Sequence, residues 1–225
     1  MTTSTPALWS APLLRFNLLP SHSLHATRAA LWLPGHDAPA LWLQRPAVQR
    51  HWHRRWSQLL LARLQQDAEP VRDLTHPATP LALASPALLY GCARHAGLVL
   101  LGKHLRQRIA RAEVRAAQQA VGRAALDWVS REGAALHPGL NDPLPWVAEG
   151  LAEGADRLGA GLLAQGWSDA PAPLRRRADW KLPLDAESPA SREASGMTPV
   201  QARQLCLQTL LFLEPEWLSS FPAIH

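Results

Sequence analysis

The chain has 225 residues, of which 47% are apolar, and it carries a formal net charge of +5 at pH 7. A chain of this length can bury a sizeable core without a metal or disulfide staple, and its apolar fraction excludes disorder along most of its length. Ala and Leu are abundant while Val, Ile, Phe and Tyr are scarce, which predicts an all-α fold. The charge is a weak sign of nucleic-acid binding, because basic residues are spread from Arg15 to Arg203.

Residues 1–44 are predicted to form an irregular segment that packs as a strap on a helical domain at 45–225. Five prolines interrupt this segment, and proline is disfavoured inside helices. The large apolar side chains that would hold the strap against the domain are Trp9, Phe16, Trp32 and Trp42.

The first predicted helix covers residues 46–66, and Trp52 and Trp56 share its apolar face. Within it, the run from Arg50 to Trp56 interleaves basic residues with tryptophans. Such a run can stack on bases or grip phosphates. The interpretation that we favour turns both tryptophans inward and leaves the Arg side chains in solvent, with an acidic protein partner as the main alternative.

Serine or threonine followed by proline marks the start of two further helices, because the hydroxyl caps the helix and proline suits its first turn. The first begins at Ser85-Pro86, and Gly102 is expected to end or bend it. The second begins at Thr198-Pro199 and stops at Glu214-Pro215.

Apolar periodicity predicts a helix at 111–132, and Asp142-Pro143 marks the start of another at 143–165. Loops are predicted at 67–84 and 133–142, and a long irregular stretch at 166–197 precedes the last helix. Within that stretch, residues 186–197 are the best candidate for disorder. The helix at 143–165 contains four glycines, which indicates either close helix packing or a broken helix. The overall prediction is an irregular multi-helix bundle.

A second basic strip follows the Gly102 bend and consists of Arg106, Arg108, Arg111 and Arg115. One interpretation is a solvated helix face. The other is a docking patch for an acidic protein surface, since complementary charge guides protein association. These four arginines are the candidate partner-binding residues.

No pattern in the sequence points to catalysis or to a bound metal. The closest histidine pair, His51 and His53, lies two residues apart and would point to different sides of a helix. The chain has no His-Glu-x-x-His motif, no Gly-x-Ser-x-Gly elbow and no phosphate-binding glycine loop. Cys92 and Cys206 sit in apolar helical patterns, where free Cys behaves as a small hydrophobe. We therefore expect no enzyme activity, no cofactor and no metal.

The sequence also predicts a cytoplasmic protein. Its first charged side chain is Arg15, so the basic start of a secretory signal is lacking. No apolar stretch approaches the length of about 18–20 residues that a membrane span needs. The two isolated cysteines favour a reducing compartment.

The run from Leu88 to Arg106 resembles the central helix-turn of the SctK/YscK family, the accessory subunits of the type III secretion sorting platform. In that family a helix with Leu and Cys leads into a Gly-Leu-Val-Leu-x-Gly run, here 97–102, and then into a basic helix. Residues 14–20 followed by Leu24-His25 are similar to the family's opening. The segments 180–184 and 202–206 resemble its C-terminal approach and its final helix, in the same order.

The resemblance implies a cytoplasmic adaptor at the cytosolic face of the inner membrane. Family members are thought to link the inner-membrane ring protein SctD, through its cytoplasmic domain, to the SctQ pod protein, with other sorting-platform components as possible partners. It implies membrane contact only through SctD and no nucleic-acid partner. The main alternative is a helical nucleic-acid-binding or regulatory protein, which would bind DNA or RNA with steep salt dependence. A small hydrolase or transferase on an unfamiliar helical scaffold is a third hypothesis.

Overall fold

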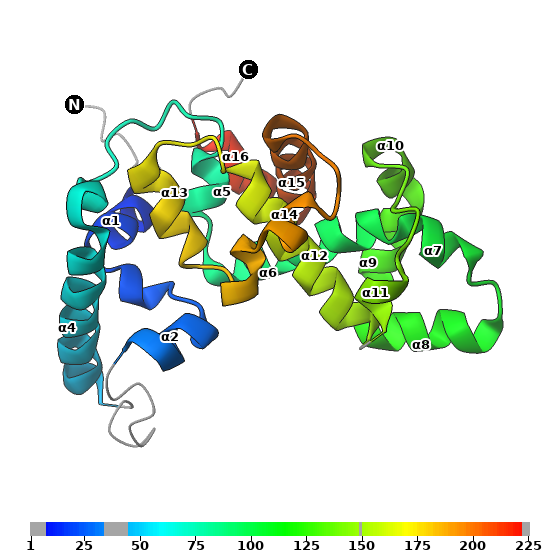
Figure 1. The fold of residues 1–225 in the computed structure, drawn as a ribbon, viewed down its shortest axis with the longest axis horizontal. Helices are drawn as coiled ribbons and strands as arrows, with labels where there is room; N and C mark the ends of the chain where they lie inside the picture. Colours follow the sequence, from blue (N-terminus) through cyan, green and yellow to red (C-terminus); the bar gives the residue numbers. More distant parts are fainter. Residues whose placement is uncertain (1–7, 34–44, 149, 222–225) are drawn as a thin grey trace. The chain divides into compact units, whose positions relative to one another are not determined.

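The computed structural model describes residues 8–33, 45–148 and 150–221, and every element assigned in these ranges is helical (Figure 1), which confirms the all-α prediction. The helices in the first half of the chain are α1 (Ser10–Leu18), η1 (Pro20–His22), α2 (Ala26–Trp32), α4 (Pro46–Leu64), η2 (Gln65–Ala68), α5 (Thr79–Leu83), α6 (Pro86–Leu100) and α7 (Gly102–Gln107). Those that follow are α8 (Arg111–Val121), α9 (Arg123–Trp128), the π-helical turn η3 (Val129–Gly133), α10 (Ala134–Leu136), α11 (Leu144–Val147), α12 (Leu151–Gly166), α13 (Ala172–Asp179), η4 (Leu184–Glu187), α14 (Pro189–Glu193), α15 (Pro199–Leu213) and α16 (Pro215–Ser219).

The predicted irregular segment at 1–44 is wrong where the structure describes it, because α1, η1 and α2 occupy most of 10–32. The prolines do not prevent these helices, since Pro12 lies in the first turn of α1 and Pro20 begins η1. Proline is tolerated there because the first turn has no backbone acceptor for its missing N–H. Trp42 and the predicted boundary at 44/45 fall at 34–44, outside the described residues.

The predicted loop at 67–84 and the irregular stretch at 166–197 also contain helices. α5 lies in the first, while α13, η4 and α14 lie in the second, and η4 and α14 cover part of residues 186–197, the segment predicted as the best candidate for disorder. α5, α13 and α14 again have proline in the first turn. Ser188 additionally caps α14 by accepting from Ser191 N–H. Proline here marks helix starts, and the sequence prediction treated it as a helix breaker.

The chain divides into two compact units, and it crosses between them more than once. Unit 1 comprises residues 1–86, 169–184 and 216–225, and unit 2 comprises 87–168 and 185–215. The chain therefore returns to unit 1 at residues 169–184, the segment that contains α13. The two units are described separately below.

The core of unit 1 forms around α4. Trp56, Leu60 and Leu64 are buried on one face of this helix together with Trp180, and Trp52 packs against them, partly buried. Arg50, Arg54 and Arg55 are exposed. The inward orientation of the tryptophans in the Arg50–Trp56 run is confirmed.

Hydrogen bonds from buried arginines hold the segment 169–184 against the rest of unit 1. Arg28 donates to the backbone oxygens of Leu182 and Pro183, at 2.8 and 3.2 Å. Arg177, which is 2% exposed, donates to the backbone oxygens of Asp67 and Ala68, at 3.2 and 2.8 Å. The bonds to Asp67 and Ala68 satisfy carbonyl groups that the end of η2 leaves without intrahelical partners.

Unit 2 is built on a close crossing of α6 and α12. A Cβ added to Gly97 would overlap the backbone carbonyl of Ala155, and one added to Gly159 would overlap that of Ala93. Each helix thus contributes an Ala-x-x-x-Gly pair, and the pairing 97 with 155 and 93 with 159 makes the helices antiparallel. The prediction that the glycines of 143–165 serve close helix packing is confirmed for Gly159, whereas Gly150 lies in the break between α11 and α12.

An ion pair supports the same crossing. Arg94 of α6 donates through Nε and Nη2 to the two carboxylate oxygens of Asp156 on α12, at 2.8 and 2.6 Å. Tyr90 donates its hydroxyl to the same carboxylate at 2.9 Å. Bidentate pairs of this kind fix geometry as well as adding energy, so they set the register of the two helices. Cys92 and Cys206 are both buried and free, as expected.

Candidate functional site

The segment predicted as one helix at 111–132 is broken at Gly122, and this break creates the candidate site. Gly122 has φ 87° and ψ 147°, a conformation that glycine adopts far more readily than other residues. The chain therefore ends α8 at Val121 and starts α9 at Arg123, and η3 continues from α9. The prediction of one unbroken helix is therefore wrong. Gly122, in the middle of the predicted helix, is the residue in the sequence that indicates the break.

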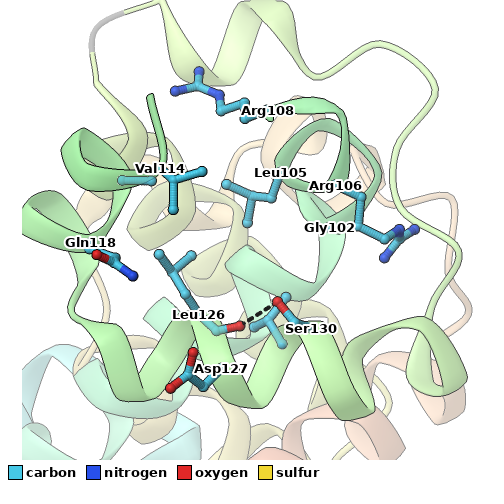
Figure 2. Close-up of a pocket in the computed structure, with 11 residues that line it drawn as sticks. Gly102, Leu105, Arg106, Arg108, Val114, Gln118, Leu126, Asp127 and Ser130 are labelled. Carbon is cyan, nitrogen blue, oxygen red and sulfur yellow. Dashed lines mark hydrogen bonds between the residues drawn. The ribbon is translucent and has the colours of Figure 1, made fainter. Parts of the chain in front are cut away.

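A cleft of about 220 Å³ lies where α7, α8, α9 and η3 meet within unit 2. Figure 2 shows Leu105, Val114 and Leu126 pointing toward one another in its middle. Polar groups surround this apolar floor. The lining consists of Gly102, Leu105, Arg106, Arg108, Val114, Ala117, Gln118, Leu126, Asp127, Val129 and Ser130.

The structure brings only two of the four candidate arginines to the cleft. Arg106 and Arg108 line it, from α7 and the residue that follows α7. Arg111 and Arg115 are exposed on α8 and do not line it. Sequence reasoning missed the apolar floor, because Leu105 and Leu126 belong to different predicted helices and meet only in the fold.

Neighbouring groups hold the two arginines in place at the rim. Arg106 donates through Nη2 to the backbone oxygen of Pro138 at 3.0 Å. Arg108 places Nε and Nη2 at 3.2 and 2.8 Å from Nε2 of His104. Burial, and next the Arg108 charge, lowers the pKa of His104, while Glu113 opposes this. His104 is therefore neutral at pH 7 and accepts from Arg108, whose positive charge has no carboxylate partner in these bonds.

The cleft lies in the most basic part of unit 2. Residues 102–136 contain seven Lys or Arg and three Asp or Glu, a formal charge of +4. The remainder of unit 2 contains four basic and eight acidic residues, a charge of −4. Asp127 is the one acidic residue that lines the cleft, and Arg123 pairs with it at 3.5 Å. The cleft is thus positive on a unit that has no net charge.

The surroundings of the cleft expose little aromatic surface on which nucleic-acid bases could stack. Proteins that bind single strands stack bases on exposed aromatic rings, and Trp128, the one Trp, Tyr or Phe within 102–136, is only 4% exposed. Four basic side chains elsewhere, those of Arg28, Arg177, Lys181 and Arg203, are buried. These four basic residues contribute to the formal net charge of the chain but not to its exposed surface.

A second groove, of about 530 Å³, runs between residues 135–138 and the segment that enters α15. Gln201, Gln204 and Gln208 line it on one side. Gln201 also completes a capping box with Thr198 at the start of α15. This groove has no charged lining residue, so it offers less to select a partner than the basic cleft does.

In the described part of the chain, no three His, Cys, Asp or Glu side chains gather in an arrangement suited to a metal ion. His53, which the sequence singled out, stacks on His22 with ring centroids 3.8 Å apart, and Ser21 bonds to it. Among the described helices, none combines the length and apolar character required to cross a bilayer.

Fold and site together define an all-helical protein of two compact units, with a basic-rimmed, apolar-floored cleft in one of them. Comparison of the chain with protein-family models, with curated proteins and with solved structures finds no match.

Proposed function

We propose that this chain is a cytoplasmic adaptor of a type III secretion sorting platform, joining the cytoplasmic domain of SctD to the SctQ pod at the inner membrane. The observation that carries the proposal is the position of the resembling run. Residues 88–106 form α6 and α7 and end at the cleft, where a basic rim surrounds an apolar floor. That combination suits contact with an acidic protein surface.

The proposal predicts that the full chain co-purifies with the SctD cytoplasmic domain or the SctQ homologue from the same genome. The double variant R106E/R108E should weaken binding of one of these partners by about tenfold, because it places like charges against an acidic surface. The matched control is R54E/R55E, which makes the same charge change on exposed residues of α4 in unit 1. Affinities are measured by titration calorimetry at low salt.

Two results would count against the adaptor role. One is a failure of both partners to bind a chain that circular dichroism shows to be helical and folded. The other is steeply salt-dependent binding of duplex DNA or RNA that is tighter than binding of either protein, since that result supports the nucleic-acid alternative.

A further inference from the structure

We propose that the cleft of α7, α8, α9 and η3 is a docking site for an acidic amphipathic helix of a partner protein, with one aliphatic side chain inserted between Leu105, Val114 and Leu126. The inference rests on the proposed adaptor function and specifies the chemistry of one partner. It is drawn from the size of the cleft, its floor and its charge.

The size of the cleft suits a single side chain. Pockets that hold drug-sized ligands and cofactors enclose about 300–1,000 Å³, and this one encloses about 220 Å³. Its floor is apolar and remains partly open to solvent, with Val114 37% exposed and Leu105 and Leu126 half-buried. Covering these three side chains removes apolar surface from water, which favours an aliphatic anchor.

The positive charge around the cleft favours a partner with acidic residues next to the inserted side chain. Arg106 and Arg108 stand on the rim, and Arg111 and Arg115 extend the positive surface along α8. The single acidic group on the rim, Asp127, is already paired with Arg123. Amphipathic helices dock in this manner, with an apolar face in a groove and polar residues outside it. A helix with Glu or Asp beside its anchor meets the arginines favourably.

The test uses the full chain and a fluorescent synthetic peptide of about four helical turns, with Leu on one face and Glu on the others. Two matched peptides replace Leu by Ser or Glu by Lys, and a fluorescent oligothymidine is the nucleic-acid probe. We expect the Leu-Glu peptide to bind, in a fluorescence-anisotropy titration, about tenfold more tightly than each matched peptide. The oligothymidine should bind more weakly than the Leu-Glu peptide.

Two variants locate the binding. V114W fills the cleft from a partly exposed position, and R106E/R108E reverses the rim; each should weaken the Leu-Glu peptide by about tenfold. R54E/R55E, on exposed residues of unit 1, should change binding by less than about twofold. Circular dichroism checks that each variant is folded, and R106E/R108E changes no floor residue.

Several outcomes would overturn the docking site. One is that the peptide with Ser in place of Leu binds as tightly as the Leu-Glu peptide. Another is that V114W and R106E/R108E bind the Leu-Glu peptide with unchanged affinity. A third is that the oligothymidine binds more tightly than any peptide. Absence of peptide binding also overturns it. If the SctD or SctQ homologue still binds in that case, the adaptor role stands. If peptides bind as expected and neither homologue does, the adaptor role falls.

Discussion

Replacing Gly97 with Ala should lower the free energy of unfolding by about 3 kcal/mol, because the new methyl group would overlap the Ala155 carbonyl and push α6 away from α12. The obstacle is backbone of the neighbouring helix, so no side-chain rotation relieves it. Gly159→Ala should have a similar effect, since its Cβ would overlap the Ala93 carbonyl. Urea denaturation followed by circular dichroism measures both changes.

Gly91 provides a matched control on the same helix. A Cβ at Gly91 would meet only the Leu213 side chain, at the ordinary contact distance of 3.4 Å. Because Ala is the better helix former, Gly91→Ala should be neutral or should stabilise by up to about 1 kcal/mol. If Gly97→Ala proved as stable as Gly91→Ala, the close crossing of α6 and α12 would be wrong.

The second large effect concerns the buried Lys181 of unit 1. Its Nζ donates to the backbone oxygens of Ala82 and Ala84, at 2.6 and 2.9 Å, and lies 4.9 Å from the centre of the Phe16 ring. Ala82 is in α5 and Ala84 follows that helix, so the amine caps its C-terminal end. Burial lowers the pKa of Lys181 from 10.5 to about 7.

This lowered pKa predicts that the protein becomes more stable as the pH rises above 7. In that range the folded chain releases the Lys181 proton while the unfolded chain keeps it, until the pH approaches 10.5. Unfolding then takes up a proton, so its free energy increases with pH, by at most about 1.4 kcal/mol per pH unit. At pH values below 7 both states hold the proton and the slope from this residue disappears.

The measurement compares urea denaturation of the wild type and of Lys181→Met between pH 6.5 and about 8.5. The variant should show a smaller rise, since Met does not titrate and only the histidines whose pKa burial lowers still contribute near the lower pH limit. The upper pH limit lies below the range in which the thiols titrate. The contact with Cys206 and burial raise the pKa of Cys92, so titration of this thiol makes the free energy of unfolding fall again at higher pH. Equal slopes in the two proteins would contradict the assignment of the lowered pKa to Lys181.

The amino-acid sequence by itself determined the all-α class and the main helix starts. The helices that begin at Pro46, Pro86 and Pro199 were predicted because capping and the fixed φ of proline act within one turn of the chain. The inward faces of Trp52 and Trp56 followed from helical periodicity for the same reason. Local rules failed where proline was read as a breaker, as in α1, α5 and α13, since its effect depends on its position in the helix.

The tertiary structure alone decided where the candidate site lies and which distant segments pack together within each unit. The cleft needs Leu105 and Leu126 side by side, and that depends on the turn at Gly122 and on the packing of three helices. Lys181 meets Ala82 across about a hundred positions of chain, and Gly97 meets Ala155 across nearly sixty. No local pattern encodes such pairs, because contacts between distant segments arise only when the whole chain buries its apolar surface.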